Sequence, residues 1–258
     1  MTKLTYTSKT INAGSNAKTV KGDDEYLTAI MYLAPYDLSR NNTCPMALLA
    51  GCHKGCLNTA GRGKFNSIQE SRIKKTNWYW DRKDHFMETL AADILRFKNK
   101  CEKNGVKPAI RLNGTSDIRW ENYKYPSGLT IFGMFPTIQY YDYTKIGNRK
   151  TDDIPNYHLT WSYSEANAKY AAGYKDAVKA GMNVAVVFRD KTLPTEFLGM
   201  TVVDGDKDDL RFLDDKGVVV GLYAKGSATK DKSGFVIDVK EVLNVCSKKS
   251  NRRVAEPA

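Results

Sequence analysis

The sequence predicts an α/β fold with a parallel sheet, organised as a partial (β/α) barrel and followed by a small β-rich C-terminal extension. Between residues 85 and 188 the expected order is helix, strand, strand, strand, helix, strand, which favours a parallel sheet. Residues 183–188 are almost wholly apolar, as in a strand covered on both faces. The segments between the expected strands are too long for hairpins, so crossover connections should join them.

The first half of the chain supplies two strands and two helices. The polar residues 1–27 predict an extended lead-in, and the apolar run 28–34 predicts a buried strand. A capping-box pattern from Ser67 to Glu70 predicts a helix over 67–77. Asp84 is the expected cap of a helix over 85–103, and a strand over 109–113 follows. One face of this second helix carries apolar residues at helical spacing: Phe86, Leu90, Ile94, Phe97 and Cys101.

Further along, strands are expected over 137–143 and 157–162, and Ser164 should cap a helix over 165–180 that precedes the strand 183–188. Short strands over 200–203 and 218–223 alternate with Gly- and Asp-rich turns. We therefore divide the chain into an α/β domain (1–196), a β-rich extension packed on it (197–246) and a mobile basic tail (247–258).

Positive charge is concentrated in the first part of the chain. The 258 residues carry a formal net charge of +11, and residues 1–150, with 24 basic and 13 acidic residues, account for all of it. Such an excess attracts phosphates or other anions. The alternative is an ordinary solvated basic face. The candidate contacts to an anionic substrate or nucleic acid are Arg62, Lys64, Arg72, Lys74 and Lys75.

Three cysteines form the sharpest motif. Cys44, Cys52 and Cys56 follow the spacing Cys-x7-Cys-x3-Cys, and a glycine precedes each of the last two, which allows the backbone to fold tightly. Soft thiolates suit zinc or an iron–sulfur cluster. Three thiolates predict a [4Fe–4S] cluster with one open iron, which is able to hold a substrate or cofactor.

Two alternatives remain for these cysteines. Zinc would take a fourth ligand, either His53 or a distant cysteine. Of the distant cysteines, Cys101 is expected in the core and Cys246 lies near the tail. The other alternative is that Cys44, Cys52 and Cys56 are buried thiols without a ligand.

Three groups of residues resemble a family of bacteriophage-encoded proteins, the gene-product-88-like family, which has no established activity. The groups are Thr43–Pro45 with Gly51–Leu57 and Gly61–Gly63; Ile110–Ile118; and Val203–Asp206 with Asp209–Arg211 and Ala224–Gly226. The resemblance implies a phage protein that acts in the host cytoplasm.

The cysteine segment also resembles that of radical S-adenosylmethionine (SAM) enzymes, although those enzymes space their cysteines as Cys-x3-Cys-x2-Cys. They carry three cysteines after the first strand of a partial barrel and a cofactor-binding segment after the second. Here the resemblance implies SAM as a cofactor. Its contacts would come from polar residues at strand ends: Asn113, Gly114, Ser116, Asp117 and Ser162.

These features together predict an iron–sulfur protein, in its narrower form a radical-SAM-like enzyme that acts on an anionic nucleotide or nucleic-acid substrate. The alternative is a non-enzymatic phage protein with a structural zinc that binds nucleic acid through residues 54–83.

No apolar run approaches the ~20 residues that cross a bilayer, and the N-terminus does not resemble a signal peptide, so we expect a cytoplasmic protein without a membrane partner.

Overall fold

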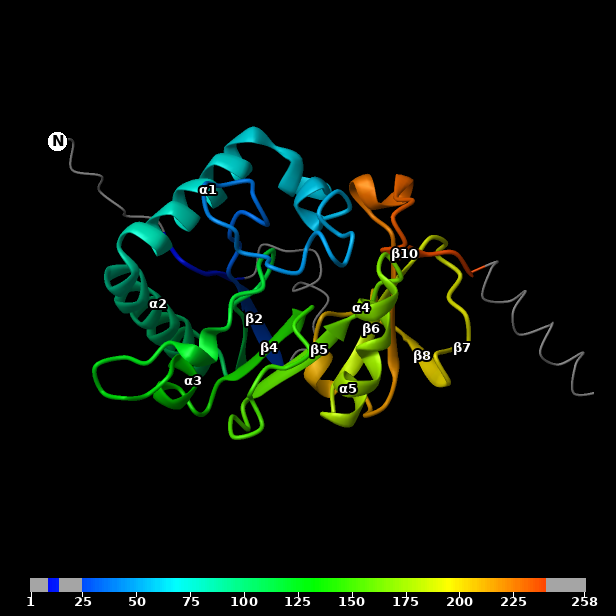
Figure 1. The fold of residues 1–258 in the computed structure, drawn as a ribbon. Helices are drawn as coiled ribbons and strands as arrows, with labels where there is room; N and C mark the ends of the chain where they lie inside the picture. The colour runs from blue at the N-terminus through cyan, green and yellow to red at the C-terminus, as the bar shows by residue number, and fades with distance from the viewer. Residues whose placement is uncertain (1–8, 14–24, 240–258) are drawn as a thin grey trace, which may run out of the picture.

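The computed structural model describes residues 9–13 and 25–239, which form one large, mostly parallel sheet with helices packed on it (Figure 1). The order along the sheet is β1-β2-β3-β4-β5-β6-β9-β8-β7, and β10 pairs with β6 off this path. The strands are β1 (Asn12–Ala13), β2 (Tyr26–Ile30), β3 (Lys107–Arg111), β4 (Gln139–Thr144), β5 (Tyr157–Ser162), β6 (Asn183–Phe188), β7 (Glu196–Phe197), β8 (Met200–Asp204), β9 (Val219–Tyr223) and β10 (Val236–Ile237).

The sheet is open at both ends of this path. From β2 to β6 each strand pairs in parallel with the next, so spatial order follows chain order. At the ends, β1 runs antiparallel to β2, and β7 runs antiparallel to β8. The α/β class and the parallel sheet are confirmed. A barrel is not confirmed, because the sheet does not close within residues 9–13 and 25–239.

The C-terminal strands continue the same sheet. β9 pairs in parallel with β6 along its whole length, from Val219 opposite Val184 to Tyr223 opposite Phe188, and β8 pairs in parallel with β9. The tail over 247–258 lies outside the described residues.

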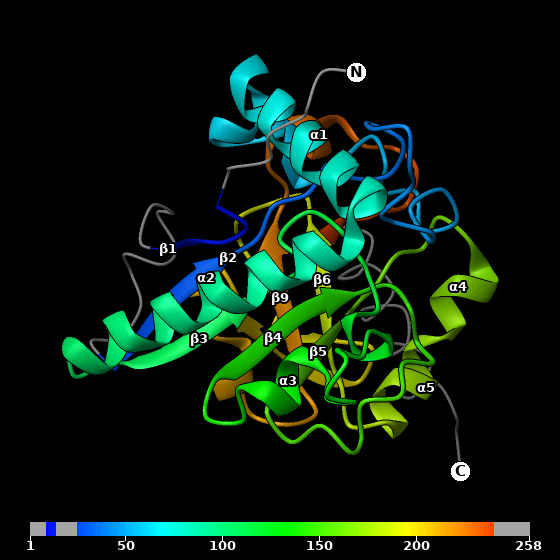
Figure 2. The ribbon, with the colours of Figure 1, turned by 90° about the vertical axis from the view of Figure 1, so that its left-hand side faces the viewer.

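Helix α2 (Lys83–Lys103) lies across one face of the sheet, and helix α1 (Asn66–Asp81) packs against α2 above the strands in Figure 2. The apolar stripe expected on the second helix is buried there, with Phe86, Leu90 and Ile94 fully inside the core. Shorter helices complete the fold: α3 (Ile131–Met134), α4 (Ala168–Ala172) and α5 (Tyr174–Lys179), with the 3-10 helices η1 (Leu57–Thr59), η2 (Gly61–Lys64), η3 (Trp120–Asn122), η4 (Arg211–Leu213) and η5 (Gly226–Lys230). None of the described helices is long and apolar enough to cross a membrane.

The expected helix caps are wrong in three places. The first helix begins at Asn66 after Phe65, so Ser67 lies inside it, and α2 begins after Arg82, which leaves Asp84 in its first turn. The third cap is Asn167, whose side chain accepts from the amide of Tyr170, while the Ser164 hydroxyl donates to Ala50 O instead. Ser164 is held by a tertiary hydrogen bond that a local pattern does not register, and the other two caps lie two residues before the expected ones.

Because β2 to β6 and β9 are parallel, their carboxyl ends share one edge of the sheet, and the loops that follow them converge there. The loop after β2 carries the cysteines and is held by the other loops. The Asp117 amide donates to Thr43 O at 2.8 Å, and the hydroxyls of Ser164 and Ser233 donate to Ala50 O and Gly51 O at 2.7 and 3.2 Å. Ligand sites of open α/β sheets lie at this edge.

Candidate functional site

The cysteine loop depends on two glycines. Gly51 has φ of +65°, and a Cβ there would lie 2.6 Å from Ser233 Oγ. A Cβ on Gly55 would lie 3.1 Å from the Phe235 ring. Glycine before Cys52 and before Cys56 therefore lets the loop turn tightly against the 233–235 segment.

Backbone amides face two of the three sulfurs. The Tyr36 amide hydrogen-bonds to the Cys44 sulfur and lowers the pKa of that thiol, and the Asn58 amide donates to Cys56 Sγ at 3.5 Å. Tyr36 has φ of +45°, a strained conformation for a residue with a side chain. Strain of this kind is concentrated at functional sites. Hydrogen bonds from amides to sulfur favour the thiolate, the form that binds metal.

The three thiols interact with one another electrostatically. Burial raises the pKa of Cys44 to about 12, and the neighbouring Cys56 adds to this shift. Burial also raises the pKa of Cys52 and of Cys56, and Cys52 contributes to the shift of Cys56. The side chains are thus within electrostatic range in the pairs Cys44–Cys56 and Cys56–Cys52, and without a ligand the thiols are neutral at pH 7.

Two cations offset this repulsion. Lys145 lowers the pKa of both Cys52 and Cys56, and Arg72 lowers that of Cys56. The Lys145 ammonium also donates to Ser162 Oγ at 2.6 Å and lies 5.0 Å from the centre of the Phe235 ring. If three thiolates held a metal centre here, Lys145 and Arg72 would partly neutralise their negative charge.

Within the part of the chain that the structure describes, no three His, Cys, Asp or Glu side chains are arranged to hold a metal ion. Zinc needs all its ligands within about 2.0–2.3 Å of one ion. His53 lies against the Tyr36 ring, Cys101 is buried in α2, and Cys246 lies outside the described residues. In a [4Fe–4S] cluster each thiolate binds a different iron, so its sulfurs do not converge on one point.

Asn113 and Ser116 have structural contacts. The Asn113 side-chain oxygen accepts from Ser116 Oγ, from the Ile118 amide and from the Trp120 indole at 2.9–3.1 Å, and its amide nitrogen donates to Ile118 O at 3.0 Å. These bonds hold the turn after β3 from within, and the Asn113 backbone amide also ties it to β4, since it donates to Asp142 Oδ1 at 2.7 Å.

Gly114 and Asp117, by contrast, join this turn to its neighbours. A Cβ on Gly114 would lie 2.6 Å from Met31 O, so glycine allows the turn to approach the end of β2. The Asp117 carboxylate accepts from Thr144 Oγ1 and from the Lys145 amide, both at 2.8 Å. Burial raises the pKa of Asp117, although these hydrogen bonds and Arg149 oppose the shift.

Three residues at this edge escaped the sequence analysis as site residues: Lys145, Arg149 and Tyr170. Arg149 is buried, pairs with Glu121 and lies 3.5 Å from Asp117 Oδ1. Tyr170 donates its hydroxyl proton to Ser162 O at 2.6 Å and interacts electrostatically with Cys52. Lys145 had a usable signal, since it lies two residues after the strand expected over 137–143.

The predicted anion-binding residues separate into two sets. Arg62, Lys64 and Lys74 are exposed. Arg72 is 9% exposed, bonds to Asn58 Oδ1 and lies over the Tyr32 ring, and Lys75 is 4% exposed and donates to Thr10 O at 3.0 Å. The structure therefore places Arg72 beside the cysteine loop and Lys75 under the N-terminal segment.

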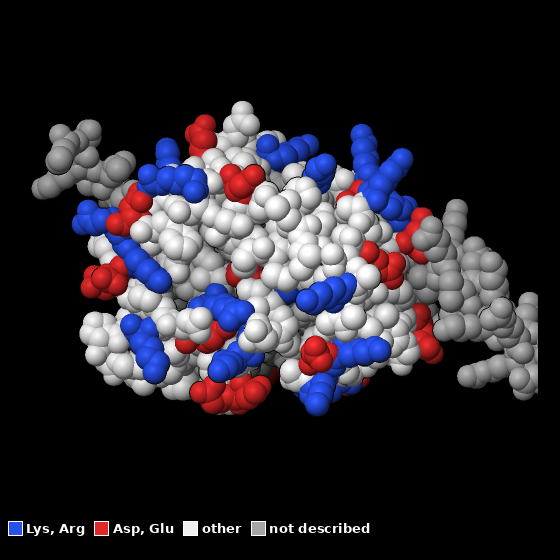
Figure 3. All heavy atoms as spheres, viewed as in Figure 1, with Lys and Arg blue, Asp and Glu red and all other residues white. Residues whose placement is uncertain are grey.

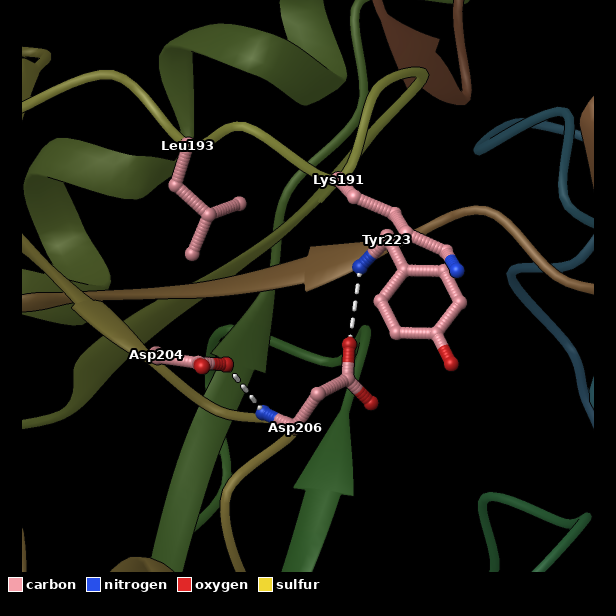
Figure 4. Close-up of a pocket in the computed structure, with 5 residues that line it drawn as sticks. All are labelled: Lys191, Leu193, Asp204, Asp206 and Tyr223. Atoms are coloured by element: carbon pink, nitrogen blue, oxygen red, sulfur yellow. Dashed lines mark hydrogen bonds between the residues drawn. The ribbon is translucent and has the colours of Figure 1, made fainter.

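A cavity of about 210 Å³ beside β9 is lined in part by Asp204 and Asp206 (Figure 4). These two residues fix the loop that follows β8. Asp204 accepts from the Asp206 amide at 2.8 Å, while the Asp206 carboxylate accepts from the Tyr223 amide at 2.9 Å and pairs with Lys225. Gly205 is required, because a Cβ would lie 2.4 Å from Val220 Cγ1. Within the motif over 203–206 and 224–226, these contacts join the loop after β8 to the end of β9.

Comparisons with known proteins identify one family. The model of the family described as gene product 88 matches residues 3–239, which is nearly the whole chain. No curated protein and no solved structure matches. The resemblance to radical SAM enzymes therefore has no support from these comparisons, whereas the resemblance to the phage family is confirmed. The chain belongs to the gene product 88 family.

Proposed function

We propose that this protein is an iron–sulfur protein in which Cys44, Cys52 and Cys56 hold a [4Fe–4S] cluster at the carboxyl edge of the sheet. The single observation that supports the proposal is that the three thiols lie on one loop, where Cys56 raises the pKa of Cys44 and Cys52 raises that of Cys56, with backbone groups that favour the thiolate at Cys44 and Cys56. A cluster replaces the thiol protons, and the N–H···S bonds and nearby cations stabilise the resulting thiolates.

The narrower form of the proposal is that a cofactor or substrate with an amino-acid head group binds between the cysteine loop and Lys145. Our candidate for this molecule is SAM. When bound, the cluster supplies one iron without a cysteine ligand. Lys145, held by Ser162 and Phe235, presents a fixed ammonium to a carboxylate. Gly114 keeps the turn after β3 close to the end of β2. The net charge and the basic loop favour an anionic substrate, such as a nucleotide or nucleic acid.

The test is anaerobic reconstitution followed by iron and sulfide analysis. We expect about four irons and four sulfides per chain. Single Cys44→Ser, Cys52→Ser and Cys56→Ser variants should lose most of the iron. Cys101→Ser is the matched control, because Cys101 is a buried thiol on α2 that takes no part in the site, and its iron content should stay at the wild-type level.

Two results would refute the cluster. One is an iron content that the three serine substitutions leave unchanged. The other is a stoichiometric zinc without iron, which would favour the alternative of a structural zinc protein.

A further inference from the structure

The 3-10 helix η5 lies directly against the end of the cysteine loop, although 168 residues separate the contacting positions. Thr59 Oγ1 and Ser227 Oγ are 2.7 Å apart, the Ser227 amide donates to Thr59 Oγ1 at 3.2 Å, and the Ser227 hydroxyl donates to Lys54 O. A Cβ on Gly226, whose φ is +59°, would lie 2.9 Å from Thr59 O. The two segments therefore form one continuous surface.

This surface carries several exposed cations, while a half-buried carboxylate on the η5 side, Asp238, pairs with Arg189. Lys54, Arg62 and Lys64 are exposed on the loop side, and Lys230 and Lys232 are exposed on the η5 side. No Asp or Glu occurs between residues 38 and 69, and Asp231 is the one acidic residue between 224 and 237. In Figure 3, Lys and Arg side chains project from the upper right of the molecule, where η5 lies in the matching view of Figure 1.

Asp231 does not neutralise these cations at the surface. It is buried, and its carboxylate accepts from the Ser233 hydroxyl at 2.8 Å and from the Val236 amide at 3.2 Å. Its carboxylate therefore holds the segment that follows η5, through Ser233 and Val236.

An aromatic ring lies among the cations. Phe65 directly follows Lys64 and is 54% exposed, and Leu57 on η1 is exposed to the same extent. Neither side chain is buried in the core, so the fold gains little from a phenyl ring at this position. A basic surface with an exposed aromatic ring is the combination that binds single strands, since phosphates contact the cations and a base stacks on the ring.

We infer that this surface binds single-stranded nucleic acid. It is called here the η2–η5 surface and is formed by Lys54, Arg62, Lys64, Phe65, Lys230 and Lys232. It differs from the anion site expected from sequence, because Arg72 and Lys75 are buried and contribute no phosphate contacts, and it includes two cations from a distant part of the chain. Binding here needs no cluster, so the inference is independent of the proposed function.

The test uses the full-length chain and a fluorescein-labelled 20-mer of deoxythymidine, with anisotropy measured at several salt concentrations. Wild-type affinity should fall steeply with salt. The double variants Arg62→Ala/Lys64→Ala and Lys230→Ala/Lys232→Ala should each lower the slope of log K against log salt by about 1.4, since each lost phosphate contact on a single strand removes about 0.7. Phe65→Ala should weaken binding at least about fivefold without changing the slope, because stacking carries no charge.

The control is Lys175→Ala/Lys179→Ala on α5, which removes the same charge from another exposed position and should leave the slope unchanged. Circular dichroism verifies that each variant is folded. The inference is overturned if the control variant loses as much affinity as the two test pairs, if a duplex of equal length binds as tightly as the single strand, or if no binding is measurable at low salt. A Cys44→Ser/Cys52→Ser/Cys56→Ser variant that still binds the 20-mer shows that a failed cluster assay leaves this inference intact.

Discussion

Lys145 and Ser162, at the ends of two neighbouring parallel strands, are joined by a hydrogen bond of 2.6 Å from the ammonium to Ser162 Oγ. Because Lys145 also interacts with Cys52 and Cys56, this contact fixes a positive charge beside the cysteine loop. Ser162 was predicted as a cofactor contact from its place at a strand end. The structure gives it a different immediate partner, a lysine that stands between it and the thiols.

The first prediction concerns that lysine. Lys145→Met should weaken SAM binding at least tenfold when affinity is compared at equal cluster content, because a charged hydrogen bond contributes about 1.5–3 kcal/mol. Isothermal titration calorimetry measures the affinity. Unchanged affinity in Lys145→Met would remove Lys145 from the proposed cofactor site.

The second prediction concerns the buried ion pair behind the site. Arg149 Nε donates to Glu121 Oε1 at 2.9 Å, and both side chains are buried. Arg149→Met should lower the free energy of unfolding by about 3–5 kcal/mol, because it leaves a buried carboxylate without its partner. Urea denaturation measures the loss. The double variant Arg149→Met/Glu121→Gln should regain part of it, and strict additivity of the two changes would contradict the pairing.

The third prediction concerns the close approach at Gly114. Gly114→Ala should destabilise the fold by about 1–3 kcal/mol, since the new methyl group would overlap Met31 O and the Ile30 side chain. Gly147→Ala is the comparison, because the nearest atom to a Cβ there is Trp161 Nε1 at 3.7 Å. Thermal unfolding of the two variants should differ clearly, and equal melting temperatures would show that the turn after β3 moves freely.

The fourth prediction is a pH dependence of stability. Burial, with Lys216 and Arg211 nearby, lowers the pKa of His158 to about 4 in the folded chain. Between pH 4 and pH 6.5 the unfolded chain binds a proton at this histidine that the folded chain does not, so His158 destabilises the fold as the pH falls through this window. At pH 5 the cost is about 2 kcal/mol, and above pH 7 it vanishes.

The control for this prediction is His158→Asn, which removes the titrating group. Between pH 7.5 and pH 5, wild type should lose about 2 kcal/mol more unfolding free energy than the variant in urea denaturation. Equal losses in the two proteins would mean that His158 is protonated in the folded state.

Much of the fold was predictable because its signals are local. Periodic apolar residues gave α2, and the apolar run gave β6 with its observed bounds Asn183–Phe188. The helix expected over 165–180 is two helices instead, since the chain breaks at Gly173 between α4 and α5. A Cβ at Gly173 would lie 3.0 Å from Tyr170 O, a close approach that the local pattern did not reveal.

The candidate site was predictable only in part. Spacing brought the three cysteines to one loop, and the parallel sheet placed the turn after β3 beside it. Sequence did not reveal that Lys75 is buried against Thr10, or that Ser227 contacts Thr59, because both contacts join segments far apart in the chain. Charge counts likewise treated Arg72 as a surface cation, whereas its guanidinium is beside Cys56.

The most direct test of the central claim is a Mössbauer spectrum of protein reconstituted with ⁵⁷Fe. A cluster held by Cys44, Cys52 and Cys56 predicts a diamagnetic [4Fe–4S] spectrum in which one iron, the one without a cysteine ligand, changes its parameters when SAM is added. A spectrum of isolated iron, or of iron that the Cys→Ser substitutions do not affect, would contradict the account.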